Sequence, residues 1–195
     1  MEQYPWKESP NKKINFFENS YARFTLPLSS SLRLREKLNK LFDQEVRTGK
    51  IFELMDSMAG IVSYSHCFAP LTSSISNRDM ICVTGSVESL HLFDKINISE
   101  DLLMEGYLNH VGKTSMEIEI NVLQEGKLKA NSLFTMVARD AKNPEKGYQV
   151  PQLSFDNLEK EEKQKALTRH EAAKVNLIMR KEEMAASYDK TPPTP

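Results

Sequence analysis

GKIFELMDSMAGIVSYSH, residues 49–66, is the stretch that decides the fold. Its apolar side chains recur at the spacing of one helix face, at Ile51, Met55, Met58 and Val62. Other apolar residues fill the flanks, so the pattern predicts a helix that is buried on most of its faces. A single acid, Asp56, interrupts it. A helix this short and this apolar needs other elements to wrap around it.

Four strand patterns follow the helix, at residues 81–92, 102–111, 115–123 and 128–140. SMEIEINVL (115–123) alternates most cleanly, with one apolar face formed by Met116, Ile118, Ile120 and Val122. Glu125-Gly126-Lys127 then predicts a hairpin turn. Four strands with short links after one buried helix predict an α+β fold, in which a curved antiparallel sheet wraps around a central helix.

The composition shifts along the chain predict four segments. Residues 1–24 are expected to be an irregular N-terminal segment, and 25–153 the main domain, which includes a short helix in LRLREKLNKLFDQEV (32–46). Residues 154–187 are expected to form a charged helical extension of one or two exposed helices, and 188–195 a proline-rich linker or tail.

The bulk composition limits the partners. The 195 residues include 26 basic and 27 acidic side chains, so no charge excess favours nucleic acid. No apolar run reaches the roughly 18 residues that a membrane span needs. The start, MEQYPWKESPNKK, lacks the apolar core of a signal peptide, and its two acids argue against a mitochondrial presequence. Cys67 and Cys82 have no metal-ligand spacing and are expected to be free thiols.

Several blocks in order resemble the hotdog-fold acyl-CoA thioesterases. They are LREKL, VRTGKIFELMDSMAG, VGKTSMEIEI, FTMVARD and VPQL, and together they cover about residues 25 to 165. The resemblance is closest to the first half of the mitochondrial type 9 enzymes, which carry two hotdog domains in tandem. It implies the hotdog fold for residues 25–153, in agreement with the helix and strands inferred above.

The resemblance also implies an activity, the hydrolysis of acyl-CoA to free fatty acid and coenzyme A. Such enzymes use no metal or other cofactor, since coenzyme A is part of the substrate. Their sites lie between two hotdog units, so a homo-oligomer or a pairing with a second hotdog domain is expected. A mitochondrial location is implied, with a cytoplasmic one as the alternative because no presequence is visible.

Two departures from the family concern the completeness of the site. Many relatives carry an asparagine six residues before the glycine that starts the helix, where this chain has Asp43, and Thr48-Gly49 replaces their Gly-Gly. The second hotdog domain is also absent. The chain is therefore expected to be a truncated or half-length form of a longer protein, or a subunit that pairs to complete its sites.

Asp56 is the candidate catalytic residue. A carboxylate can act as general base toward water, and partial burial among Phe52, Met55 and Met58 is expected to disfavour its charged form. The helix start at Gly49 and Lys50 offers backbone N–H groups for the thioester oxygen. The alternative roles for Asp56 are a solvent-facing helix acid and one half of a buried ion pair.

The candidate substrate-binding residues include a second group. Lys113, Thr114 and Ser115 open a strand and offer one cation and two hydroxyls to the phosphates and pantetheine of coenzyme A. Arg139 is a weaker candidate for the same contact. For each of them an ordinary structural role remains open, as a turn or as an ion-pair residue. The four histidines are scattered and are expected to be structural.

Two other functions remain open. A hotdog dehydratase would need a histidine paired with an acid, and no histidine falls at the helix start. A non-catalytic hotdog half would bind acyl-CoA, or pair with a second unit, without releasing a thiol.

Overall fold

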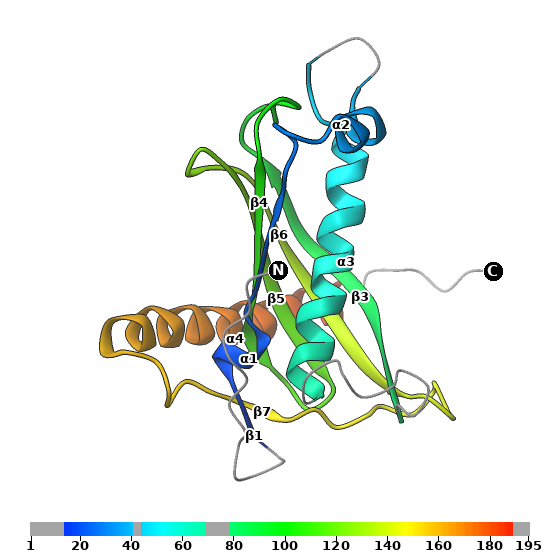
Figure 1. The fold of residues 1–195 in the computed structure, drawn as a ribbon. Coiled ribbons are helices and arrows are strands. Elements are labelled where there is room, and N and C mark those ends of the chain that lie inside the picture. The colour runs from blue at the N-terminus through cyan, green and yellow to red at the C-terminus, as the bar shows by residue number, and fades with distance from the viewer. Residues whose placement is uncertain (1–13, 41–43, 69–78, 189–195) are drawn as a thin grey trace, which may run out of the picture.

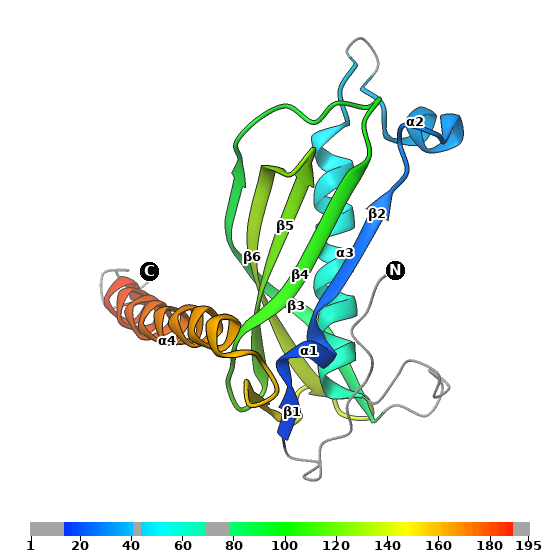
Figure 2. The same cartoon turned by 60° about the vertical axis from the view of Figure 1, so that its left-hand side comes forward.

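A curved antiparallel sheet lies between two long helices in the computed structural model, which describes residues 14–40, 44–68 and 79–188. Helix α3 (Thr48–Cys67) lies along the inner face of the sheet, and helix α4 (Lys160–Tyr188) crosses the outer face (Figure 1). Turned by 60°, the view shows α4 projecting away from the sheet on the side opposite to α3 (Figure 2). The predicted arrangement of a sheet wrapped around one helix is confirmed.

The sheet has five strands in the order β2-β4-β5-β6-β3. Their bounds are Ala22–Leu26 (β2), Met80–Leu92 (β3), Leu102–Val111 (β4), Ser115–Gln124 (β5) and Lys127–Asp140 (β6). The four predicted strands are thus confirmed to within a few residues. The hairpin turn is confirmed as well, because Glu125 and Gly126 both have positive φ, as a tight two-residue hairpin requires.

The N-terminal segment is more ordered than the irregular structure expected for residues 1–24. Its described part forms strand β1 (Ile14–Phe16), helix α1 (Phe17–Ser20) and most of β2. The expectation of irregular structure was wrong there because β2 pairs with β4 along five residues, and Ala22 is fully buried. Strand β1 pairs in parallel with β7 (Gln152–Ser154), which follows the main sheet in the chain. Residues 1–13 and 189–195, and with them most of the predicted tail, lie outside the described residues.

Helix α2 (Leu32–Leu38) is shorter than the predicted helix at 32–46. Asn39 is already extended, and the described residues after it pair through their backbones instead of continuing the helix. Asn39 bridges to Val46, and the N–H of Val46 donates to the carbonyl of Ile96. This pairing places Val46 in the core, 5% exposed, and it outweighs the local helical pattern.

A single helix, α4, forms the charged extension, and it is less exposed than predicted. Its Ala166 and Ala173 are buried, and its His170 bonds through Nδ1 to the carbonyl oxygen of Asn109 on β4 (2.9 Å). Further along, the guanidinium of Arg180 bonds to Glu117 on β5 and Glu88 on β3. Glu117 is therefore buried under α4. Within the described ranges no helix is both long and apolar enough to cross a membrane.

Helix α3 packs tightly against the sheet at Gly106 on β4. A Cβ atom at this position would lie 3.0 Å from Met58 and 3.0 Å from Val62, both on α3 and both fully buried. Packing therefore favours glycine here, since the side chains of Met58 and Val62 would have to shift to admit a Cβ atom.

We predict that Gly106→Ala lowers the free energy of unfolding by about 1–3 kcal/mol, the usual effect of one extra methyl group in a packed core. Gly60→Ala on α3 is the matched control. A Cβ there meets nothing within 4 Å, and alanine favours a helix by about 0.5–1 kcal/mol, so this variant should be more stable. Urea unfolding of both variants measures the difference. Equal effects in the two variants would contradict the packing argument.

His66 ties the C-terminal end of α3 to the segment before β7. Its ring is completely buried, and Nε2 donates to the carbonyl oxygen of Pro151 at 2.9 Å, which leaves Nδ1 unprotonated. Burial lowers the pKa of His66 to about 4, although the hydrogen bond to Pro151 opposes this effect. The folded protein thus keeps a neutral imidazole where the unfolded chain takes up a proton.

We therefore predict that His66 contributes to acid destabilisation between about pH 6.5 and pH 4. Over this range only the unfolded chain binds the proton at His66, so stability should fall as the pH falls, by about 3 kcal/mol in total. His66→Gln removes the titrating group and should flatten this part of the stability curve. Urea unfolding at a series of pH values compares the two proteins. Parallel curves would show that His66 does not titrate as inferred.

Candidate active site

Asp56 lies on the flank of α3 that faces the edge strand β3. Its Oδ1 accepts a hydrogen bond of 2.7 Å from the hydroxyl of Thr84 on β3. The carboxylate is exposed, so the partial burial predicted for it is wrong for this chain. The reason is helical geometry, because Met55 and Met58 point to the sheet and Asp56 is turned by about 100° from Met55.

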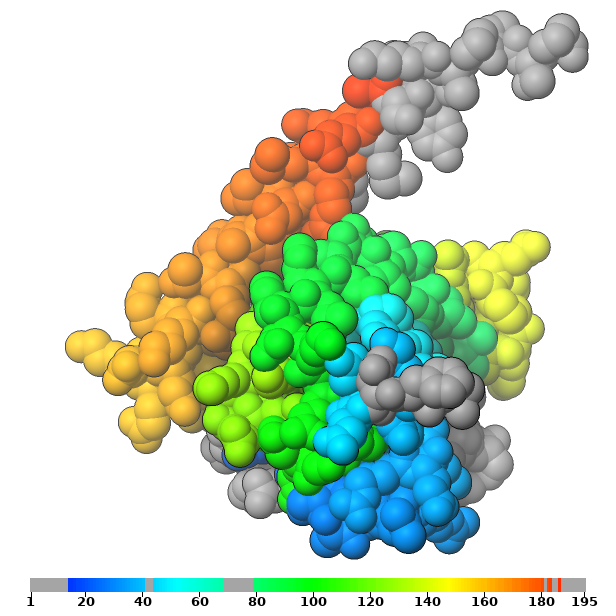
Figure 3. Space-filling model, turned by 90° about the horizontal axis from the view of Figure 1, so that it is seen from above, coloured from blue at the N-terminus to red at the C-terminus, as the bar shows by residue number. Residues whose placement is uncertain are grey.

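The start of α3 is the second part of the candidate site. Figure 3 shows the beginning of α3 at the surface beside α2 when the molecule is seen from above. Gly49 is exposed there, and a Cβ atom at this position would meet nothing within 4 Å. Arg47, the residue before the helix, makes no side-chain cap hydrogen bond in the described part of the chain. The first turn therefore presents backbone N–H groups and the positive end of the helix dipole.

Lys50 makes its contacts within α3, and its role in substrate binding stays a prediction. Its ammonium group pairs with Glu53 at 2.7 Å, and its backbone N–H donates to the carbonyl of Arg47 at 2.9 Å. Both polar groups of Lys50 are thus used within the first turns of α3. Gly49 is the better placed of the two residues, since it lies seven residues before Asp56 on the same face of the helix, about 10 Å along the axis.

The structure brings Lys113, Thr114, Ser115 and Arg139 together, but not next to Gly49. Lys113–Ser115 form the turn between β4 and β5, in which the N–H of Gly112 donates to Ser115. The carbonyl of Thr114 accepts from the N–H of Ala138, which neighbours Arg139. Arg139 also bonds through its guanidinium to the carbonyl of Glu145 (3.3 Å).

This turn lies at the opposite end of α3 from Gly49. Cys67, the last residue of α3, contacts Met116 at 3.8 Å between the two sulfur atoms, beside Ser115. A helix of 20 residues is about 30 Å long, so the two predicted groups of substrate-binding residues are separated by that distance within one chain.

Thr84 is the residue that the sequence analysis missed. The available signal was Gly85, because a glycine inside a strand pattern often marks a bulge. The pairing of β3 with β6 does shift register between Thr84 and Ser86. This irregularity accompanies the turn of the Thr84 hydroxyl toward α3. Asp43, the other residue singled out near the site, lies outside the described residues.

Strand β3 carries an apolar exposed edge next to Asp56. It is the last strand in the sheet order, so the backbone groups along one side of it face no neighbouring strand of the described sheet. Five large apolar side chains on it and just after it are 40–58% exposed: Val83, Val87, Leu90, Leu92 and Phe93. Exposed apolar residues in such a row indicate an interaction surface.

The thioesterase superfamily model matches residues 47–130, which contain α3, β3, β4 and β5. Among curated relatives, the mitochondrial acyl-coenzyme A thioesterase 4 of Humulus lupulus is 36% identical over 123 residues, 59% of this chain and 23% of that protein. The mitochondrial acyl-coenzyme A thioesterase 9 of Bos taurus is 31% identical over 150 residues, 74% of this chain and 33% of that protein. The chain thus spans a third or less of the length of these relatives.

Solved structures show the same fold. A hexameric acyl-CoA thioesterase superposes with a TM-score of 0.64 at 23% identity, over 89% of this chain and 98% of that chain. An acyl-CoA hydrolase of Staphylococcus aureus, solved with butyryl coenzyme A and coenzyme A, gives a TM-score of 0.65 at 17% identity, over 90% and 95%. Residues 47–130 are thus similar to the thioesterase superfamily, and the described residues have the fold of one hotdog unit.

Proposed function

We propose that this chain is the hydrolytic unit of an acyl-CoA thioesterase, which converts acyl-CoA to free fatty acid and coenzyme A. The observation that carries the proposal is the Asp56 carboxylate, held by Thr84 on the open flank between α3 and β3. The curated relatives named as acyl-coenzyme A thioesterases, and a hydrolase of the same fold solved with coenzyme A, support the substrate class.

Asp56 acts as the general base in this proposal. The Thr84 hydroxyl occupies Oδ1 and fixes the plane of the carboxylate, so that Oδ2 is directed to a water molecule. The water loses a proton to Asp56 as its oxygen attacks the thioester carbonyl carbon. The tetrahedral intermediate then collapses and releases coenzyme A as a thiolate, a good leaving group that needs no strong acid catalyst.

The N–H of Gly49 stabilises the oxygen of the thioester as it gains negative charge. Side chains on a helix lean toward its N-terminus, which shortens the distance of about 10 Å between Asp56 and Gly49. A water about 3 Å from the carboxylate and a carbonyl carbon about 3 Å beyond it bridge the remaining gap. The mechanism uses no cofactor, since coenzyme A enters as part of the substrate.

A second hotdog unit completes the site by pairing with β3. It is a second copy of this chain or a further hotdog domain of a longer protein. Two β3 strands that pair antiparallel are related by a two-fold axis, which is the usual symmetry of dimers. The partner strand therefore runs in the opposite direction. The partner's turn with Lys113, Thr114 and Ser115 then comes to the end of the pair where Gly49 lies. In this arrangement the two groups of candidate substrate-binding residues meet across the interface, Arg139 included.

The location of the protein is proposed to be mitochondrial. The thioesterases of Humulus lupulus and Bos taurus that match this chain are named as mitochondrial, which supports the proposal. Immunodetection of the protein in purified mitochondria and in cytosol tests it.

We predict that Asp56→Asn lowers acyl-CoA turnover about 100- to 10,000-fold, the usual loss when a general base is removed. The melting temperature should change little, since the side chain is exposed. Release of coenzyme A, followed with a thiol reagent, measures turnover, and circular dichroism measures unfolding on the same sample.

Asp101→Asn is the control for this variant. Asp101 is also an exposed aspartate that accepts a hydrogen bond from a hydroxyl, that of Ser29 at 2.6 Å, so its loss should leave turnover unchanged. Normal turnover in Asp56→Asn would rule out the general base. Tight acyl-CoA binding by a wild-type protein that releases no thiol would favour the non-catalytic hotdog half instead.

We also predict that Val87→Lys prevents pairing through β3. Val87 is 50% exposed on this strand, and a lysine there opposes edge-to-edge association while leaving the core intact. Light scattering should show a dimer or larger assembly for the wild type and a monomer for the variant, whose turnover should fall at least about tenfold. Val175→Lys, at a valine 55% exposed on α4, is the control. A monomeric wild type with full activity would contradict the proposed pairing.

A further inference from the structure

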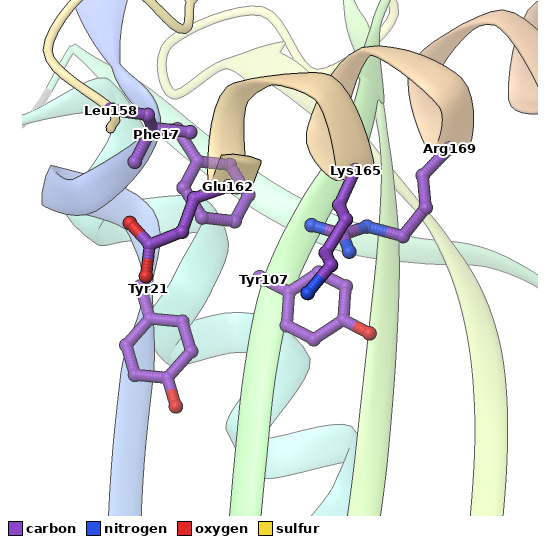
Figure 4. Close-up of a pocket in the computed structure, with 7 residues that line it drawn as sticks. All are labelled: Phe17, Tyr21, Tyr107, Leu158, Glu162, Lys165 and Arg169. Atoms are coloured by element: carbon purple, nitrogen blue, oxygen red, sulfur yellow. The ribbon is translucent and has the colours of Figure 1, made fainter. Parts of the chain in front are cut away.

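The structure contains a pocket on the outer face of the sheet, away from the candidate active site. It is an open pocket of about 300 Å³ between α4, α1 and strand β4 (Figure 4). The side chains that give it its chemistry are three aromatic rings and three charged groups: Phe17, Tyr21, Tyr107, Glu162, Lys165 and Arg169. Tyr107 follows Gly106, which faces α3, so Tyr107 points to the opposite side of the sheet.

The floor of the pocket is a fixed aromatic surface. Tyr21, just before β2, lies beside Tyr107 on β4, with ring centroids 6.4 Å apart and planes only 5° from parallel (Figure 4). The hydroxyl of Tyr107 accepts a hydrogen bond from Asn121 (3.1 Å), and that of Tyr21 donates to Glu105 (3.0 Å). Burial and the charge of Glu119 raise the pKa of Tyr107 to about 12, so its ring stays neutral.

Two cations from α4 lie above this floor. The guanidinium carbon of Arg169 lies 4.8 Å from the centroid of Tyr107 and 6.0 Å from that of Phe17. The Nε of Arg169 is buried and has no hydrogen-bond partner among the described residues, an arrangement that costs free energy. Lys165 extends toward Tyr107 in Figure 4. Its ammonium contacts Glu161 at 3.1 Å on the exposed side of the helix.

We propose that this pocket binds a nucleoside monophosphate. A flat base stacks on the parallel Tyr21 and Tyr107 rings, as bases do on aromatic platforms. The phosphate accepts hydrogen bonds from the ammonium of Lys165 and from the guanidinium group of Arg169. Glu162, whose carboxylate points toward Tyr21 in Figure 4, accepts from an amino group of the base. A volume of about 300 Å³ is at the lower end of the range for small-ligand sites, which suits a mononucleotide.

The competing interpretation is a purely structural clamp. In that case Arg169 only holds α4 on the sheet by stacking on Tyr107 and Phe17, and the exposed Lys165 contributes nothing. The two interpretations differ in the roles of Lys165, Tyr21 and Glu162. A clamp between Arg169 and Tyr107 does not need these three side chains, whereas a nucleotide site does.

Calorimetric titration of the full chain with AMP tests the proposal. Saturating coenzyme A is present throughout, because AMP resembles part of that molecule and could otherwise enter the candidate active site. We expect saturable binding below about 1 mM, with adenosine and inorganic phosphate each bound at least tenfold more weakly. Lys165→Ala should weaken AMP binding about tenfold, and Tyr21→Leu about five- to hundredfold through the lost stacking.

Lys174→Ala is the matched control. Lys174 is a lysine of the same helix that pairs with Glu171 at 2.9 Å and lies outside the pocket, so AMP binding should be unchanged in this variant. The KM for acyl-CoA should be the same in all three variants, and the heat of AMP binding is measurable whether or not the chain hydrolyses acyl-CoA.

Three results would overturn the proposal. The first is the absence of saturable AMP binding in the presence of coenzyme A. The second is equal AMP affinity in Lys165→Ala, Tyr21→Leu and the wild type, which would indicate the structural clamp. The third is phosphate binding as tight as AMP binding, which would indicate a simple anion contact without recognition of a base.

Discussion

The close contact between α3 and β4 at Gly106 is the constraint on which the rest of the structure depends. Met58 and Val62 reach the backbone of the strand because no side chain stands between them. This contact fixes the rotation of α3 about its own axis, and every other side chain on the helix follows from that rotation. Asp56 is turned toward β3 for this reason. The carboxylate is thus positioned by apolar packing on the opposite flank of the helix.

The outer face of the sheet is built on a different principle. Polar and charged side chains from β4, β5 and β6 form hydrogen bonds with one another there. The side-chain amides of Asn109 and Asn131, for example, both donate to the carboxylate of Glu119. Helix α4 covers part of this network and adds Arg180, which bonds to Glu88 and Glu117. Burial raises the pKa of Glu117, while hydrogen bonds from Ser86, Arg180 and Thr135 outweigh burial and lower that of Glu88. The inner face of the sheet thus holds α3 by apolar contact, whereas the outer face holds α4 by an apolar cluster around Ala166 together with these polar contacts.

Periodicity predicted α3 and four strands because each has a buried side that its residues must match. Met116, Ile118, Ile120 and Val122 are all fully buried, as their alternation indicated. Strand β2 and the early end of α2 could not be predicted in this way, since both are decided by pairing with residues far away in the chain, Val46 with Ile96 for instance. For the candidate site, the sequence indicated which residue types could perform the chemistry. It could not indicate that Asp56 is exposed or bonded to Thr84, because both depend on β3 being the edge of the sheet.

The parallel pair of β1 and β7 has a consequence for the order in which the molecule folds. Ile14 pairs with Gln152, so the two strands close a loop that contains the whole sheet and α3. During synthesis β1 leaves the ribosome first, yet its partner emerges only after β6 is complete. Closing a loop of this length costs conformational entropy before the contacts between β1 and β7 can stabilise it. Such contacts between residues far apart in the chain slow folding. The side-chain amide of Asn15 donates to the carbonyl of His66 near the end of α3. This hydrogen bond is therefore also expected to form late. Until then the nascent chain exposes the end of its central helix.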